Sequence, residues 1–226
     1  HGGPHGIRDY WGFNWETQLL ASRGYAVMQV NFRGSGGYGD DFLRAGYKQW
    51  GLRMQDDITD ATKWAVQQGY ADPKRLSIYG ASYGGYAALE GVIREPDLYR
   101  CAIGYVGVYD LGLMYKYGDI PGSLYGKRFL EMVLGTDNAD MRARSPAWNV
   151  DKIKAPLMLV AGGRDQRVPV AQADALRDAL DKRKVSYEWL LKDKEGHGFY
   201  RTDNKVELYT KMLAFLDAHT GASTGH

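Results

Sequence analysis

The feature that most limits the fold of this chain is an alternation of short apolar runs with longer amphipathic stretches. Strand-like runs are predicted at 26–32, 75–79, 101–108, 156–160 and 186–191. Segments with apolar residues at helical spacing follow at 57–68, 84–94, 170–182 and 204–219. Strands that alternate with helices of this length are typical of βαβ units. The sequence therefore predicts an α/β fold with a mostly parallel sheet flanked by helices.

The stretch 111–148 breaks this alternation and is rich in Tyr, Gly and Met. We interpret it as an inserted helical segment beside the site. The total of 226 residues suits one domain, predicted over 1–220 with a polar tail at 221–226.

Charge, cysteine content and hydropathy exclude several classes of function. The net charge of +2, without a basic run, gives no footprint for nucleic acid. Cys101 is the single cysteine, which rules out an internal disulfide and a cysteine metal site. No apolar run reaches the roughly 18 residues that a membrane span needs. We expect no nucleic-acid or membrane partner, and the sequence leaves the cellular compartment open.

A serine lies in the turn between the second apolar run and the helix that follows. Gly80-Ala81-Ser82-Tyr83-Gly84 fits the pattern G-x-S-x-G, after RLSIY and before GYAALEGVI. A nucleophile elbow requires this strand–turn–helix setting, and glycines allow its tight turn. The alternative is a glycine-rich turn whose serine caps the helix. The context favours Ser82 as a nucleophile.

One of the five histidines is placed to activate that serine, which needs a neighbouring base near neutral pH. His197 lies in the glycine-flanked loop EGHGF, directly after the last predicted strand. The α/β-hydrolase fold places its base there, in the chain order Ser, acid, His. His219 ends the closing helix, and His226 lies in the tail. The alternative for His197 is an ordinary surface-loop histidine.

The acid that orients the imidazole is predicted to be Asp165, in the loop after the strand PLMLV. Parallel strands present their carboxyl ends at one edge of a sheet, so loops after three strands can meet there. Asp151 and Asp193 are rivals. Asp193 is very near His197 in sequence, and Asp151 precedes its strand. The alternative for Asp165 is a turn aspartate.

An acyl-transfer site also needs donors for the oxyanion. The backbone N–H of Tyr83, directly after the nucleophile, is one candidate, and an HGG-type loop supplies the other. The sequence HGGP at 1–4 is such a loop. Alone it would also fit a plain turn or a tag remnant.

These motifs together resemble the catalytic domain of the prolyl oligopeptidase family of serine peptidases, and most of all its acylaminoacyl-peptidase and dipeptidyl-peptidase branches. The matching pieces occur in family order and cover nearly the whole chain: HGGPHG at 1–6, NFRGSGGYGDDF at 31–42, GASYGGYAAL at 80–89, RSPAWNVDKIKAPLML at 144–159, GGRDQRVP at 162–169 and EGHGF at 195–199. The combination of GxSYGGY with DxxVP is far more specific than G-x-S-x-G alone.

The resemblance implies a triad of Ser82, Asp165 and His197, and an oxyanion hole from the N–H groups of Gly3 and Tyr83. It also implies that Arg167, two residues after the acid, contacts a substrate carbonyl; the alternative is a solvated arginine. Some members have an oxyanion tyrosine at the position of His1, so no such role is assigned to that side chain.

The resemblance further implies a β-propeller upstream of the catalytic domain and a sheet whose first strands are missing from this chain. In the family fold, the strand leading into HGGP lies between 26–32 and 75–79, so a vacancy is expected there. Endopeptidase and exopeptidase action stay open, as does oligomerisation.

The predicted function is a serine peptidase that cleaves short peptides through an acyl-enzyme. From their place after the third strand, Val108, Leu111, Met114 and Tyr115 are expected to line an apolar pocket for the P1 side chain. No metal or organic cofactor is implied. A carboxylesterase on the same fold is one rival, against which Arg167 and the segment RGSGGYG argue. A catalytically inactive binding module is the other, although such a protein should lack a triad member.

Overall fold

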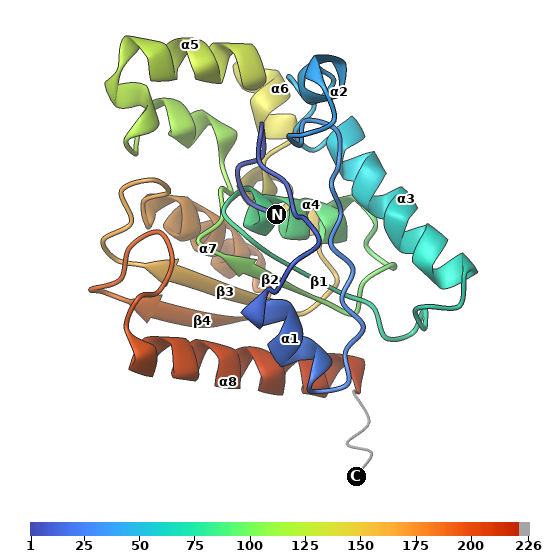
Figure 1. Cartoon of the computed structure of the whole chain (residues 1–226). Helices are drawn as coiled ribbons and strands as arrows, with labels where there is room; N and C mark the ends of the chain where they lie inside the picture. Colours follow the sequence, from blue (N-terminus) through green and yellow to red (C-terminus); the bar gives the residue numbers. More distant parts are fainter. Residues whose placement is uncertain (222–226) are drawn as a thin grey trace.

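The computed structural model describes residues 1–221, so the expected tail lies outside the described residues apart from Gly221 (Figure 1). The strands are β1 Ser77–Ala81, β2 Cys101–Tyr105, β3 Leu157–Gly162 and β4 Tyr187–Lys192. The α-helices are α1 Trp15–Ala21, α2 Asp40–Arg44, α3 Arg53–Gln67, α4 Tyr83–Arg94, α5 Leu124–Val133, α6 Asn138–Ala143, α7 Ala171–Arg183 and α8 Thr202–Thr220. Short 3₁₀ helices are η1 Leu111–Tyr115, η2 Ile120–Gly122, η3 Pro146–Trp148 and η4 Val150–Lys152.

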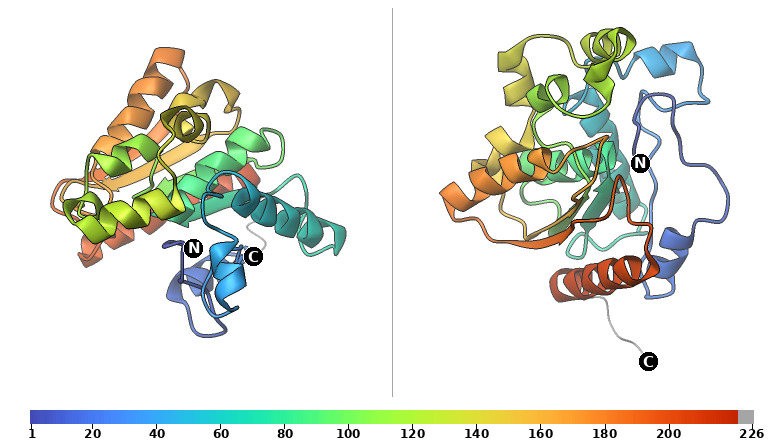
Figure 2. Two further views of the ribbon diagram at one scale, coloured as in Figure 1. Left: turned by 90° about the horizontal axis from the view of Figure 1, so that it is seen from above. Right: turned by 90° about the vertical axis from the view of Figure 1, so that its left-hand side faces the viewer.

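The four strands form one parallel sheet in the order β1-β2-β3-β4, which confirms the predicted fold class. Side chains of β2 and β3 alternate between two apolar clusters, as strand geometry requires. Ala102 and Leu159 face the cluster that contains α4 and α7. Ile103 and Met158 face the cluster that contains α8. The sheet is therefore covered by helices on both faces (Figures 1 and 2).

The stretch 111–148 forms the helical insertion that the sequence predicts. It folds into η1, η2, α5, α6 and η3, above the end of the sheet where the strands finish (Figure 1). Its apolar residues join a third cluster with the first turn of α4, including Leu111, Leu130, Tyr83 and Trp50. The insertion is thereby anchored next to the serine turn.

The predicted strand at 26–32 is wrong. The segment runs beside β1 without regular structure, and residues 26–31 make no backbone–backbone hydrogen bond within residues 1–221. Its apolar composition favours a strand, but a strand forms only where a neighbour pairs its N–H and C=O groups. Where another described segment approaches it, at Asp9, the hydrogen bonds run through the Asn31 side chain and not through its backbone.

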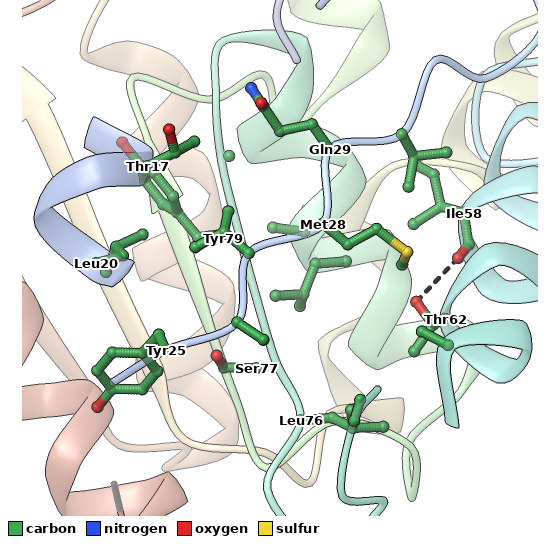
Figure 3. Close-up of a pocket in the computed structure, with 18 of the residues that line it drawn as sticks. Thr17, Leu20, Tyr25, Met28, Gln29, Ile58, Thr62, Leu76, Ser77 and Tyr79 are labelled. Carbon is green, nitrogen blue, oxygen red and sulfur yellow. Dashed lines mark hydrogen bonds between the residues drawn. The ribbon is translucent and has the colours of Figure 1, made fainter. Parts of the chain in front are cut away.

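A cavity of about 1040 Å³ separates this segment from β1. Figure 3 shows Tyr25, Met28 and Gln29 of this segment and Ser77 and Tyr79 of β1 among the residues that line it. The walls combine apolar side chains with the polar backbone edges of two extended segments. Within the described residues, β1 pairs only with β2, so its second edge faces this cavity.

Of the helices within residues 1–221, none is both long enough and apolar enough to cross a bilayer.

Candidate active site

The turn between β1 and α4 holds Ser82 in a backbone conformation that side chains rarely adopt. Its φ of 59° and ψ of −120° lie far from both helix and strand values. Its N–H donates to the Tyr105 carbonyl at 2.9 Å, and its own carbonyl accepts from Tyr86 at 3.2 Å. These bonds fix the strained residue between the sheet and the helix. A strained serine at a strand–helix turn is the geometry of a nucleophile elbow.

Glycines around the elbow are required by close packing. A Cβ at Gly80 would overlap the backbone of Gly84, and a Cβ at Gly85 would come within 2.9 Å of the Gly107 Cα. Helix α4 therefore approaches β1 and the end of β2 more closely than any side chain would allow. The pattern G-x-S-x-G-G thus follows from the packing of this turn.

Asp165 is buried in the loop after β3 and is held by its surroundings. Its Oδ1 accepts from the backbone N–H groups of Arg167 at 2.9 Å and Val168 at 2.8 Å. Its Oδ2 lies 2.7 Å from Nδ1 of His197, and its side chain is only 1% exposed. Each carboxylate oxygen therefore has a defined partner. The bonds to Oδ1 orient the acid, and the contact of Oδ2 orients the imidazole.

The rival acids do not share this position. Asp151 and Asp193 are both exposed. Within residues 1–221, Asp165 alone of the three is hydrogen-bonded to His197.

The loop that carries His197 is fixed by hydrogen bonds to the buried side chain of Glu195, which is 2% exposed. Its carboxylate accepts from the N–H groups of Tyr200 at 2.7 Å and Arg201 at 3.1 Å, and from the Asn204 amide at 2.6 Å. Burial acts to raise the pKa of Glu195, but these hydrogen bonds outweigh it and lower the pKa below its ordinary value. Sequence reasoning did not single out this residue, although it lies two positions before the histidine.

The acid loop and the histidine loop pack directly on each other through glycine. A Cβ at Gly162 would overlap the Gly196 carbonyl oxygen, and a Cβ at Gly163 would lie 2.7 Å from the Asp193 Cα. The N–H of Arg164 donates to the Glu195 carbonyl at 2.8 Å. The short Asp165–His197 contact therefore rests on a close and hydrogen-bonded pair of loops.

The serine and the imidazole lie at the ends of parallel strands, after β1 and β4 respectively. Within residues 1–221, no hydrogen bond joins the Ser82 hydroxyl to His197. Contacts of this kind are often long in proteins without substrate and shorten in the complex. The structure thus forms the acid–imidazole pair and leaves the serine–imidazole contact unmade.

The glycines of the HGGP loop lie against the elbow. A Cβ at Gly2 would lie 3.5 Å from the Ser82 Cβ, and Gly3, with φ of 109°, lines the same cavity as Ser82 and Tyr83. The His1 ring stacks on Phe32 and hydrogen-bonds to Ser35 at 2.8 Å.

A second loop supports the HGGP loop. Gly6 donates to the Gly34 carbonyl at 3.0 Å, and Gly36 donates to Ile7 at 2.9 Å. His5 accepts from Trp50 Nε1 at 3.1 Å, and burial lowers its pKa to about 4, so its ring is neutral near pH 7. The motif HGGPHG is therefore held to RGSGG by backbone bonds.

A cavity of about 140 Å³ opens beside Ser82. Of the residues expected to line the P1 pocket, Val108 and Met114 line this cavity. Arg167, which was expected to contact a substrate carbonyl, lines it as well. The remaining lining is mostly apolar or aromatic and comes from the loops and the helical insertion: Trp50, Tyr117, Ile120, Phe129, Val168, Pro169, with Gln172, Gly3 and Tyr83.

The expectation for Leu111 and Tyr115 needs correction, because neither lines this cavity. Leu111 is fully buried in the third apolar cluster. The Tyr115 hydroxyl donates to the Gly135 carbonyl at 2.5 Å. The 3₁₀ turn of η1 directs both residues into the packing of the insertion rather than toward the serine.

Arg167 lies at the cavity wall and is paired with Asp119 at 3.0 Å; both side chains are about half exposed. The N–H of Asp119 also donates to the Gln166 carbonyl at 2.9 Å. The insertion and the acid loop are therefore joined at this wall.

A sequence profile of the prolyl oligopeptidase family matches residues 11–223. Among curated relatives, a dipeptidyl aminopeptidase BIII of Pseudoxanthomonas mexicana is 39% identical over 224 residues, which cover 96% of this chain and 32% of the relative. An acylamino-acid-releasing enzyme of Arabidopsis thaliana is 27% identical, with 97% and 29% of the two chains covered. The chain thus spans about a third of the length of these relatives.

Solved structures give the same picture. A puromycin-hydrolyzing peptidase of Mycobacterium tuberculosis superposes with a TM-score of 0.91 at 31% identity, over 98% of this chain and 33% of that one. An acylaminoacyl peptidase of Pyrococcus horikoshii superposes with a TM-score of 0.87 at 29% identity, over 97% of this chain and 36% of that one.

Proposed function

Because the chain belongs to the prolyl oligopeptidase family of serine peptidases, we propose that residues 1–220 are the catalytic domain of a peptidase that cleaves short peptides through an acyl-enzyme on Ser82. The observation that carries this proposal is the 2.7 Å contact between buried Asp165 and His197, at the sheet edge where the strained serine lies. A β-propeller elsewhere in the full-length protein is part of the proposal, since the relatives are about three times longer.

In the first step His197 Nε2 takes the proton of the Ser82 hydroxyl while the serine oxygen attacks the scissile carbonyl. Asp165 accepts a hydrogen bond from Nδ1, which fixes the tautomer and stabilises the imidazolium. The imidazolium then gives its proton to the leaving amine, and water repeats the sequence to release the acid. The backbone bonds to Asp165 Oδ1 keep the carboxylate in place through both steps.

The oxyanion that forms in each step is proposed to accept from the N–H groups of Tyr83 and Gly3. Tyr83 N–H is the first of helix α4, where the helix end favours negative charge. Gly3 lies in the cavity with Ser82 and has no side chain to obstruct the oxygen. Preorganised donors of this kind are usually the largest single contribution to acyl-transfer rates.

The 140 Å³ cavity is proposed to hold the P1 side chain, and its lining favours an apolar or aromatic residue. Arg167 would donate to a carbonyl on the acyl side of the scissile bond. A substrate with such a second carbonyl is a peptide rather than a simple ester, and this favours peptidase over carboxylesterase action. The relatives act on dipeptidyl and acylaminoacyl substrates by name, which agrees with short peptides.

The test is hydrolysis of dipeptide and N-acyl amino-acid anilides with an apolar P1 residue by the full-length gene product. Ser82→Ala should lower kcat by on the order of 10⁶. Ser123→Ala is a suitable control, because Ser123 only caps α5 in the insertion. Turnover that survives Ser82→Ala, or activity confined to simple esters, would contradict the proposal.

A further inference from the structure

A cluster of buried polar groups lies between α3 and α4, behind the nucleophile elbow. Glu90 is 3% exposed, Gln55 is 0% exposed and Tyr83 is 1% exposed. Glu90 Oε1, Gln55 Oε1 and the Tyr83 hydroxyl have no hydrogen-bond partner within residues 1–221. Buried polar atoms without partners are rare in folded proteins, so each calls for an explanation.

The cluster is tied to the geometry of the serine turn. Tyr83, Ala87 and Glu90 occupy positions i, i+4 and i+7 of α4 and so share one face of the helix. Gln55 of α3 donates to the Ala87 carbonyl at 3.1 Å, and its amide would lie 3.4 Å from a Cβ at Gly91. Displacement of this face of α4 would therefore move Ser82 and the Tyr83 N–H together.

The cations near Glu90 are engaged elsewhere. Arg94 donates to the carbonyls of Gly51 and Leu52 and pairs with Asp56 of α3 at 2.6 Å. Arg144, at the end of α6, donates to backbone carbonyls and pairs with Asp140. Lys152 of η4 donates to Asn149 at 2.9 Å. None of these bonds neutralises a carboxylate at position 90.

Burial raises the pKa of Glu90 to about 8, and the pull of Arg94, Lys152 and Arg144 in the other direction is weaker. Burial also raises the pKa values of the Tyr83 and Tyr86 hydroxyls well above their ordinary value, so both phenols stay neutral. A neutral Glu90 carries an O–H donor, and Gln55 Oε1 of α3 is a buried acceptor without a partner within residues 1–221. The protonated acid thus adds a donor to a cluster that has an unpaired acceptor, and it brings no charge that needs a partner.

We propose that Glu90 is a positioning residue for the nucleophile elbow that acts as a neutral carboxylic acid, and that loss of its proton in mildly alkaline solution displaces α4 and lowers turnover at Ser82. A carboxylate in this place would require a charge partner or water, and both would require α4 or α3 to move. The inference rests on the function proposed above, since it concerns the rate at the same serine.

The experiment measures kcat of the full-length protein at about pH 7 and about pH 9, for wild type, Glu90→Gln and Glu95→Gln. Glutamine has the shape of the neutral acid and does not titrate. Wild type should lose about tenfold between these pH values, as expected for a group that titrates near 8. Glu90→Gln should lose little. Glu95→Gln removes a more exposed carboxylate, paired with Lys63 at the end of the same helix, and should follow wild type.

Equal alkaline losses in wild type and Glu90→Gln would overturn the proposal, and so would the absence of an alkaline loss in wild type. If wild type has no turnover on any peptide and Ser82 does not react with a fluorophosphonate, the proposed function itself fails. Infrared spectra of wild type decide the charge state without any variant. A protonated-carboxyl band that is present near pH 7 and lost near pH 9 supports the proposal. Its absence near pH 7 overturns the proposal.

Discussion

The carboxyl ends of the strands and the lateral edge of β1 belong to one sheet, but their surroundings differ. At the carboxyl ends, loops pack on one another through glycines, and Asp165 and Glu195 have a partner for every carboxylate oxygen. Along β1, by contrast, one backbone edge faces a cavity of about 1040 Å³ and an extended segment without pairing (Figure 3).

The difference shows two ways in which a sequence specifies structure. Each loop at the carboxyl ends is a short motif that contains its own turn, glycines and hydrogen-bond partners. A strand instead needs a neighbour from elsewhere, and within residues 1–221 the segment 26–31 has none. We therefore expect changes at the carboxyl ends to affect chemistry, and changes along β1 to affect stability.

The largest effect is expected from Asp165→Asn in the full-length protein. The amide cannot hold the imidazole in the required tautomer, so kcat should fall by about 10⁴ while the thermal transition changes little. Asp193→Asn changes an exposed rival acid near the same histidine and should leave kcat unaltered. An equal loss in both variants would show that the acid is misassigned.

The second effect concerns the open edge of β1. We predict that an extended segment of the full-length protein fills the cavity and pairs with β1 and with 26–31. Each buried polar group left without a partner costs about 1–3 kcal/mol, and a domain has only about 5–15 kcal/mol of stability. Residues 1–226 expressed alone should therefore lack a cooperative thermal transition. A sharp calorimetric transition of residues 1–226 alone, together with full activity, would contradict this prediction. It would show that the lateral edge of β1 is as well satisfied as the carboxyl ends of the strands.

The third effect is on substrate choice. Arg167→Ala should lower kcat/KM for a blocked dipeptide substrate by roughly 10- to 150-fold, because a charge-assisted hydrogen bond contributes about 1.5–3 kcal/mol. p-Nitrophenyl acetate has no second carbonyl and should be hydrolysed at a nearly unchanged rate. Arg164→Ala is the matched control, since Arg164 is exposed on the same loop and does not line the cavity. An equal loss on both substrates would indicate damage to Asp165 instead.

The smallest effect is a dependence of stability on pH at the histidine loop. The folded-state pKa of Glu195 is lowered, so its contribution to stability is present above its unfolded pKa and is lost as the pH falls through the folded value. Melting temperatures of wild type should therefore decrease in acid, and the decrease should be smaller in Glu195→Gln. An equal decrease of the melting temperature in acid for wild type and Glu195→Gln would contradict a stabilising role of the Glu195 carboxylate.

Much of the fold and the acid–imidazole pair could be predicted from the sequence because local patterns encode them. The strand PLMLV and the loop after it place Asp165, and EGHGF places His197. The run at 26–32 was predicted as a strand from its apolar composition, which does not supply a partner. The vacancy expected between this run and 75–79 is the cavity that lies beside β1.

The pocket could be predicted only in part. Val108 and Met114 follow β2 closely in sequence, whereas Trp50 and Phe129 reach the cavity from distant segments. The Tyr- and Met-rich composition of the insertion suggested that residues such as Phe129 lie near the site. No local pattern suggested that Trp50 lines the cavity. Leu111 was misplaced because a 3₁₀ turn rotates successive side chains differently from an extended chain.

Fluorophosphonate labelling of the full-length protein, followed by peptide mapping, tests the central assignment most directly. We expect one labelled residue, Ser82, and labelling that is abolished by Ser82→Ala and strongly slowed by His197→Ala. Labelling of a different serine, with turnover retained in Ser82→Ala, would contradict this assignment.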